Sequence, residues 1–243
     1  MFIITDSIDQ NNFYICNLKI SFPLKKIYLI FLLLIFSGTS VFSQISKTHY
    51  IPALTSDSGN AQATDAHIYI STPSTTIVNV TIQQIGGSAI PGTVRNDASV
   101  EYSIPDLNQL FANRNDTGEV INNKGYIISA DCPIYVSIRY NVTNQAGAFT
   151  SKGAAGLGTH FRTAMYPNGN ISTPVQAGDF LSYVSIMATK NNTKIKATLP
   201  NATSTSEILV NNVEVNYTAP IEIDLDKNET YIIAVEYANT NPV

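Results

Sequence analysis

The sequence has no tryptophan, and it holds only two cysteines and three histidines. Charged residues are also scarce, at 13% of the chain, whereas hydrophobic residues make up 44%. An intrinsically disordered chain has the opposite balance of apolar and charged residues. A nucleic-acid-binding domain is normally basic, but this chain carries a formal net charge of −4. Two cysteines cannot build a disulfide scaffold. The length of 243 residues predicts one or two domains.

An apolar run close to the start of the chain predicts export. Residues 27–36 are uninterrupted apolar side chains, Lys25 and Lys26 precede them, and Val41-Phe42-Ser43 follows. A basic start, a short apolar core and small residues before a cleavage point are the three parts of a secretory signal peptide. A membrane-spanning helix needs about 20 apolar residues, roughly twice this length. We therefore expect residues 1–43 to be a cleaved signal peptide and the mature, secreted or surface-located chain, without a transmembrane span, to begin at Gln44.

The residues ahead of the two lysines are unusually many for a signal peptide. Residues 1–23 mix polar and apolar side chains, whereas a start near Leu24 would give an ordinary signal peptide. Cys16 lies in the removed part, so the mature chain keeps one cysteine, Cys132. A lone thiol could be reactive or could pair between chains. No histidine lies near Cys132 in the sequence, so we interpret it as a small apolar residue at a strand end.

The mature chain has the hydrophobic alternation of β-strands. Apolar side chains recur at every second position in six segments, which is the period of a half-buried strand. These segments are residues 67–70, 77–82, 100–104, 134–140, 181–187 and 194–199. Asn211-Asn212 predicts a hairpin turn between 208–210 and 213–217, because asparagine tolerates left-handed backbone conformations. Short strands with frequent turns indicate an all-β, antiparallel, sandwich-like fold.

Two further local features complete the expected strand pattern. Residues 226–229 predict a tight turn between 221–225 and 231–235. The best helix candidate is 105–111, with about two turns.

The chain also contains an approximate repeat. Thr72, Thr76 and Thr81 recur 117 positions later as Thr189, Thr193 and Thr198. Residues 100–104 correspond to 221–225 with a slightly larger offset. Because such repeats change the predicted domain organisation, we expect two related tandem units, 44–147 and 181–243, joined by a Gly-rich connecting region, 148–180.

The second of these units is expected to be incomplete. Counterparts of the strands at 125–129 and 134–140 would fall beyond Val243, so the chain could be a fragment of a longer protein. The segment 231–237 would then be an apolar edge strand with unpaired backbone groups, which is an aggregation hazard.

Four segments resemble one protein family. Residues 123–136 have the sequence Asn-Lys-Gly-Tyr-Ile-Ile-Ser-Ala-Asp-Cys-Pro-Ile-Tyr-Val, and three shorter motifs occur at 156–167, 185–195 and 225–231. Together they resemble the IgG Fc-binding protein N-terminal domain family, which is widespread in bacterial surface proteins. The resemblance runs from about His49 to the end of the chain. It implies a β-rich, non-enzymatic surface module, and it identifies no ligand-binding residue in this sequence.

The sequence offers no catalytic constellation. His49, His67 and His160 are far apart, whereas a zinc site needs clustered ligands. The Gly-rich segment 153–158 lacks the preceding strand and the following helix of a dinucleotide-binding loop. The oxygen-bearing segment 56–60, with Asp65, could hold calcium, but its spacing is typical of ordinary turns. We therefore predict no catalytic, cofactor-binding or metal-binding residues and no cofactor.

Three functions remain open at this point. The first is a non-enzymatic cell-surface binding or adhesion module with an extracellular protein or glycan ligand. The second is a structural spacer repeat of a larger surface protein, without a ligand of its own. The third and most remote is an exported carbohydrate-active enzyme, for which the sequence shows no motif of paired carboxylates.

Overall fold

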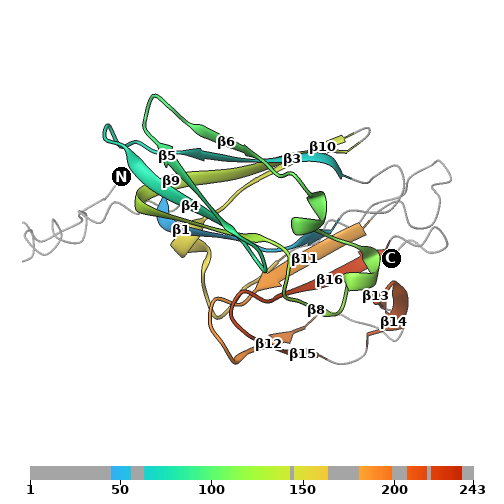
Figure 1. Ribbon diagram of the computed structural model, residues 1–243. Coiled ribbons are helices and arrows are strands. Elements are labelled where there is room, and N and C mark those ends of the chain that lie inside the picture. Colours follow the sequence, from blue (N-terminus) through green and yellow to red (C-terminus); the bar gives the residue numbers. More distant parts are fainter. Residues whose placement is uncertain are drawn as a thin grey trace, which may run out of the picture. The chain divides into compact units, whose positions relative to one another are not determined.

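A computed structural model describes residues 45–55, 63–142, 145–163, 181–198, 207–217 and 220–236. Contact density groups Ser43–Val243 into one compact unit. The predicted signal peptide lies outside the described residues. The described residues are all-β, as predicted, with mainly antiparallel strand pairs and short 3-10 turns (Figure 1).

The central element is β9, a strand of 17 residues from Tyr126 to Val142. Its first half pairs with β4 and β1, and its second half pairs with β3 and β10. Two partners that pair with the same stretch must flank β9 on opposite sides. Because the two halves of β9 have different partners, β9 belongs to two sheets, whose strand orders are β5-β4-β9-β1 and β6-β3-β9-β10. The other strands are β1 (Ser46–Ile51), β3 (Ala63–Ser71), β4 (Val78–Gln84), β5 (Ala89–Val94), β6 (Val100–Ser103) and β10 (Gln145–Thr150).

Pro133 lies where β9 passes from one sheet to the other. The pairing with β4 ends at Ala130, and the pairing with β3 begins at Tyr135. Proline has no backbone N–H to donate to a sheet, so this gap in the pairing is where β9 accommodates it.

The main hydrophobic core lies between these two sheets. Alternate residues of β3, β4 and β9 point into it, which is what the period-two pattern predicts. Ile68 and Ile70 of β3 are 0% exposed, and Val80 and Ile82 of β4 are 2% exposed. β9 contributes Ile128, Ile134, Val136 and Ile138.

A third sheet has the order β14-β13-β16-β11, with β8 pairing with the start of β16. Its strands are β8 (Val120–Ile121), β11 (Leu181–Met187), β13 (Glu207–Val210), β14 (Val213–Asn216) and β16 (Thr230–Glu236). One face of this sheet packs against a two-stranded ribbon of β12 (Thr193–Ala197) and β15 (Ile221–Leu225) through Ile223 and Leu225. The other face packs against Ala53 and Ala112 from the predicted first unit, and Ile121 of β8 belongs to the same cluster.

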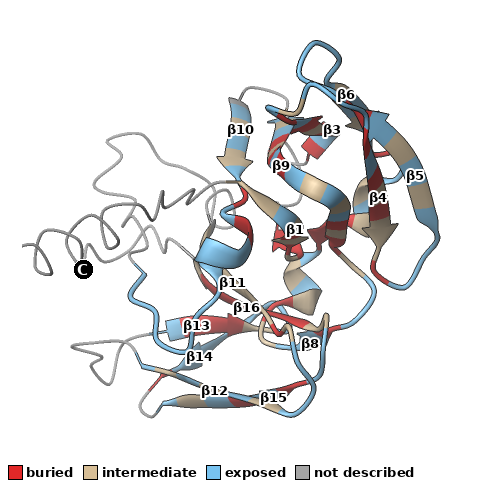
Figure 2. Cartoon of the chain, turned by 90° about the vertical axis from the view of Figure 1, so that its left-hand side faces the viewer, coloured by how far each residue is buried: buried red, intermediate tan, exposed pale blue. Residues whose placement is uncertain are grey.

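The prediction that residues 231–237 form an edge strand is wrong. β16 pairs with β11 on one side and with β13 and β8 on the other. Tyr231 and Ile233 point into one core cluster, whereas Ile232 and Ala234 point into another. A strand with an unbroken apolar run is one that is buried on both faces, and Figure 2 shows β16 largely in the colour of buried residues.

The predicted turns are present, but the predicted helix is much shorter. Asn211 and Asn212 have φ values of 50° and 61° in the β13–β14 hairpin. Residues 226–229 form a turn, with Glu229 N donating to Asp226 O over 3.0 Å. The helix candidate 105–111 is a single 3-10 turn, Leu107–Gln109, because Phe111 instead enters the short strand β7 (Phe111–Ala112) and pairs with β2 (Leu54–Thr55).

The two-unit organisation with an incomplete second unit stays a prediction, but the strand pairing allows the two predicted units, 44–147 and 181–243, to be compared strand by strand. In the first unit, β9 pairs with β3 and with the β4–β5 hairpin. In the second, β16 pairs with β11 and with the β13–β14 hairpin. By its place in the pairing, β4 of the first unit corresponds to β13 of the second. By the sequence offset, β4 corresponds instead to β12.

Candidate binding surface

The sheet β6-β3-β9-β10 presents one side to the core and the other side outward. Because residues directly opposite each other on paired strands share a face, the strand register identifies the outward residues. We call this set of residues the outer face. It consists of Asp65, His67, Tyr69, Ser71, Glu101, Ser103, Tyr135, Ser137, Arg139, Asn141, Ala146, Ala148 and Thr150. It thus combines aromatic, amide, hydroxyl and charged groups, and includes no aliphatic side chain larger than alanine.

Tyr69 and Arg139 lie at the centre of the outer face. The guanidinium carbon of Arg139 is 5.2 Å from the centroid of the Tyr69 ring, which is a cation–π contact. The ring of His67 is 6.1 Å from that of Tyr69, measured between centroids. The contact with Tyr69 holds the guanidinium group against a rigid ring.

Both carboxylates of the outer face already have partners. Asn141 Nδ2 donates to the two carboxylate oxygens of Asp65 over 2.9 and 3.2 Å. His67 Nδ1 lies 2.9 Å from Oε1 of Glu101, within ion-pair distance, although Nδ1 makes no aligned hydrogen bond. Arg139 forms no hydrogen bond or ion pair with any residue that the structure describes.

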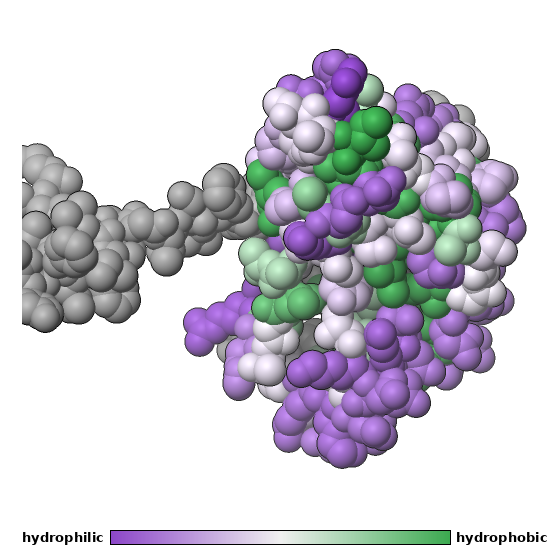
Figure 3. Space-filling view, turned by 60° about the vertical axis from the view of Figure 1, so that its left-hand side comes forward, coloured by the Kyte–Doolittle hydropathy of each residue, from purple (hydrophilic) through white to green (hydrophobic). Residues whose placement is uncertain are grey.

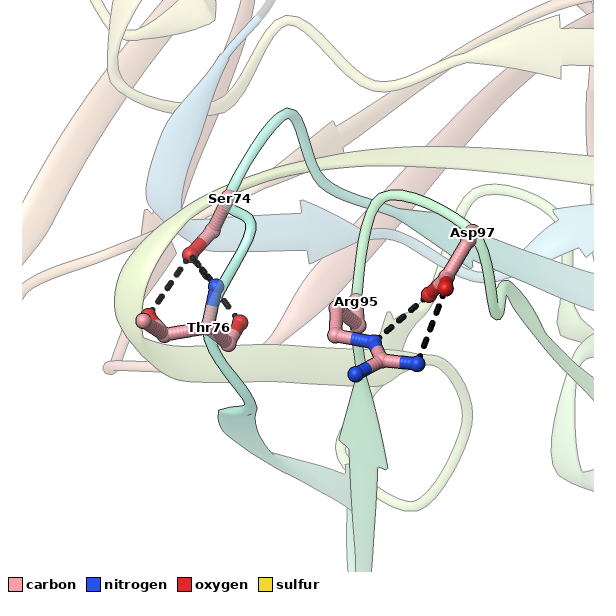
Figure 4. A network of polar contacts seen from close by, with 4 residues as sticks. All are labelled: Ser74, Thr76, Arg95 and Asp97. Atoms are coloured by element: carbon pink, nitrogen blue, oxygen red, sulfur yellow. Dashed lines mark hydrogen bonds and ion pairs between the residues drawn. The ribbon is translucent and has the colours of Figure 1, made fainter.

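Arg95 provides a contrast within the same chain. It lies just after β5, and its Nε and Nη2 donate to the carboxylate of Asp97 over 2.6 and 2.8 Å (Figure 4). The same view shows the adjacent turn, in which Thr76 N donates to Ser74 Oγ over 3.2 Å. Arg95 therefore has an internal counterion in the two-bond geometry that guanidinium groups prefer, whereas Arg139 has none among the residues that the structure describes.

The three histidines are separate in space as well as in sequence. His49 in β1 is 0% exposed, and its Nε2 lies 2.9 Å from the backbone oxygen of Ile134. Burial lowers the pKa of His49 below its ordinary value. His160 is exposed, and its Nδ1 is 3.1 Å from the hydroxyl of Thr159. Only His67 therefore belongs to the outer face.

Among the described residues, the other candidates from the sequence are not grouped into a further site. Cys132 is a free, half-buried thiol packed against the main core. Gly153–Gly156 is a 3-10 turn. The segment 56–60 lies outside the described residues, and Asp65 is bound to Asn141. Within the described ranges no three His, Cys, Asp or Glu side chains are grouped so as to hold a metal ion.

The described surface has two further features. A hollow of about 330 Å³ is lined by residues that include Asp106, Phe111 and Asn113. Hydrophilic side chains also gather at the lower end of the molecule in Figure 3, where the β12–β15 ribbon carries exposed ion pairs such as Lys194–Asp224. Such exposed pairs are self-satisfied and contribute little. Across the part of the chain that is described, no helix is both long and apolar enough to span a membrane.

In comparisons with known proteins, no family model matches the chain, and no curated protein or solved structure shows significant similarity to it. The resemblance to the IgG Fc-binding protein N-terminal domain family therefore stays an expectation from the sequence motifs.

Sequence reasoning did not find the outer face. The alternation predicted which side chains of 67–70 and 134–140 share a side of their own strand. It did not predict that four segments distant in the sequence pair in the order β6-β3-β9-β10. The proximity of Tyr69 and Arg139 depends on that pairing, because the two residues lie 70 positions apart.

Proposed function

We propose that this chain is an exported, non-enzymatic binding or adhesion module of the cell surface, and that the outer face is its recognition surface. The observation that carries the proposal is the Tyr69–Arg139 pair, a preorganised aromatic and guanidinium group with no internal counterion among the described residues. Tyrosine and arginine are enriched at the positions that dominate binding energy. The resemblance to a family of bacterial surface proteins supports the same class of function.

The proposal is tested by probing a glycan array and a protein array with the purified chain. We expect binding to at least one ligand, and we expect the double variant Tyr69→Leu/Arg139→Gln to lose it. The matched control is Arg95→Gln, which also removes an exposed guanidinium but lies outside the outer face. Incubated glycans should remain intact by mass spectrometry, because the proposed module does not act on them.

Two results would contradict the proposal. The absence of any bound ligand would favour a spacer repeat without a ligand of its own. Binding that survives the double variant would place the recognition surface elsewhere on the molecule.

The export step is a separate part of this proposal. The basic, apolar and small-residue segments of residues 25–43 support cleavage before Gln44. N-terminal sequencing of exported material should begin at Gln44. Exported material that retains residue 24 would contradict cleavage.

A further inference from the structure

We propose that the outer face binds an anionic carbohydrate, with the carboxylate or sulfate group held by Arg139. This inference rests on the proposed function and specifies the ligand class of the same surface. Its basis is the charge distribution over β9 and β10, the side-chain sizes beside Arg139, and the position of Tyr135.

The β9–β10 half of the outer face carries one charged group, the guanidinium of Arg139. The outward residues of these two strands include Ser137, Asn141 and Thr150, and Arg139 is the charged residue among them. The negative groups of the outer face, Asp65 and Glu101, lie on β3 and β6 and have partners on the protein. A planar guanidinium with free donors binds a carboxylate or sulfate through two parallel hydrogen bonds.

The side chains beside Arg139 leave space for the ligand. Ala148 lies directly opposite Arg139 on β10, and Ala146 lies opposite Asn141. Both alanines are exposed and too small to cover the guanidinium group. Because Tyr69 restricts the guanidinium on one side, the donors can be satisfied from the β10 side without rearrangement of the sheet.

The same half of the face suits a carbohydrate better than an acidic peptide. A bound peptide usually places apolar side chains in pockets, whereas this surface, apart from Tyr135 and Arg139, is composed of hydroxyl, amide and small groups. Sugar hydroxyls can exchange hydrogen bonds with Ser137 and Thr150, whose hydroxyls both donate and accept, and can donate to the amide oxygen of Asn141, whose Nδ2 already donates to Asp65. Tyr135 is 38% exposed and four residues from Arg139, so its ring lies roughly 13 Å along the strand. An extended oligosaccharide can therefore contact this ring while its anionic group reaches Arg139.

The test measures binding of the purified chain to four immobilised probes. They are oligomers of galacturonic acid, sulfated galactose oligomers, neutral galactose oligomers and poly-glutamate. The two charged saccharides distinguish carboxylate from sulfate, the neutral oligomer keeps the sugar without the charge, and poly-glutamate supplies carboxylates on a peptide. We expect binding to at least one charged saccharide that is at least about tenfold tighter than binding to the neutral oligomer or to poly-glutamate.

Variants assign the charge preference to Arg139. Arg139→Gln should weaken binding to the charged saccharide about tenfold, and Arg139→Lys should restore only part of it, because lysine lacks the planar pair of donors. Tyr135→Ala should weaken binding to charged and neutral saccharides alike, because it removes a ring and no charge. Arg95→Gln should leave binding unchanged. Circular dichroism of each variant shows whether its fold is retained.

The outcomes separate this inference from the proposed function. Equal binding of charged and neutral saccharides, tighter binding of poly-glutamate, or no effect of Arg139→Gln in a folded variant would overturn the anionic-carbohydrate assignment. The proposed function would still stand if the arrays show another ligand that is lost in the Tyr69/Arg139 double variant. If none of the four probes binds but the arrays show such a ligand, only the inference fails.

Discussion

At the scale of single residues, His49 couples the stability of the fold to pH. Its Nε2 bonds to Ile134 O, and its buried Nδ1 has no hydrogen-bond partner among the described residues. Desolvation disfavours the charged imidazolium, whereas the backbone groups of Ile134, Ser46 and Ser151 partly offset this effect. The net result is a folded-state pKa below the unfolded value of 6.5.

The sign of the pH dependence follows from this shift. At a pH below 6.5 the unfolded chain binds a proton at His49 more readily than the folded chain does. The His49 contribution to the unfolding free energy is therefore complete above this pH and falls as the pH decreases toward the folded-state pKa. Denaturant titrations between pH 8 and about 5 should show this loss, and His49→Gln should reduce its slope. The control His160→Gln changes an exposed histidine, and an equal reduction in slope there would contradict the assignment.

Gly125 is a second residue whose role is local and steric. It adopts φ of +105°, and an added Cβ would lie 2.5 Å from the backbone oxygen of Ile51. Gly125→Ala should therefore lower the unfolding free energy by about 2–3 kcal/mol, measured by urea denaturation. Gly156→Ala is the matched control, because its Cβ would meet only the Lys152 side chain. Similar losses in the two variants would refute this account.

At the scale of secondary-structure elements, the β13–β14 hairpin depends on its two asparagines. Asn211 and Asn212 both have left-handed backbone conformations, as a two-residue hairpin turn of this kind requires. Asn211→Ala should lower the free energy of unfolding by about 1 kcal/mol, because the left-handed backbone conformation is less favourable for alanine than for asparagine. Asn211→Gly should be close to neutral, and calorimetry can compare the three chains. A larger loss with glycine than with alanine would contradict the backbone explanation.

The sequence predicted elements better than it predicted their partners. Period-two alternation located β3, β4, β6, β11 and β12, because that signal is local to each strand. It also contained a usable clue to β16, since an unbroken apolar run indicates burial on both faces. The repeat offset instead predicts an edge strand, because it assigns no strand beside this segment. The strand pairings around β16 join segments that are far apart in the sequence. The same is true of the strand pairings that form the outer face.

At the scale of the whole molecule, the two predicted units, 44–147 and 181–243, share a core and backbone hydrogen bonds. Gly118 N donates to Ile232 O over 2.9 Å, and Asn211 N donates to Thr117 O over 2.7 Å. Ser185 Oγ donates to the backbone oxygen of Ala53 over 2.6 Å. Burial in this region also raises the pKa of Tyr183 to about 12. These contacts predict that the two parts are mutually stabilising, even though the sequence suggests two related units.

Ile232→Ala tests this coupling. Ile232 is 0% exposed and packs in the cluster that contains Ala53, Ala112 and Ile121. Its truncation should lower the unfolding free energy by about 3 kcal/mol, because it removes buried methyl groups and leaves a cavity. Hydrogen exchange measured by mass spectrometry should then accelerate in residues 111–121 as well as in 181–236, since both sides of the cluster lose packing.

The neighbouring residue provides the control for this experiment. Ile233 is also an isoleucine of β16, but its side chain points into the other cluster, against the β12–β15 ribbon. Ile233→Ala should destabilise the sheet β14-β13-β16-β11 to a similar extent, while accelerating exchange in residues 111–121 less than Ile232→Ala does. Acceleration confined to residues 181–236 in the Ile232→Ala chain would show that the two parts unfold independently. The tandem-unit organisation suggested by the repeat would then describe the stability of the molecule as well as its sequence.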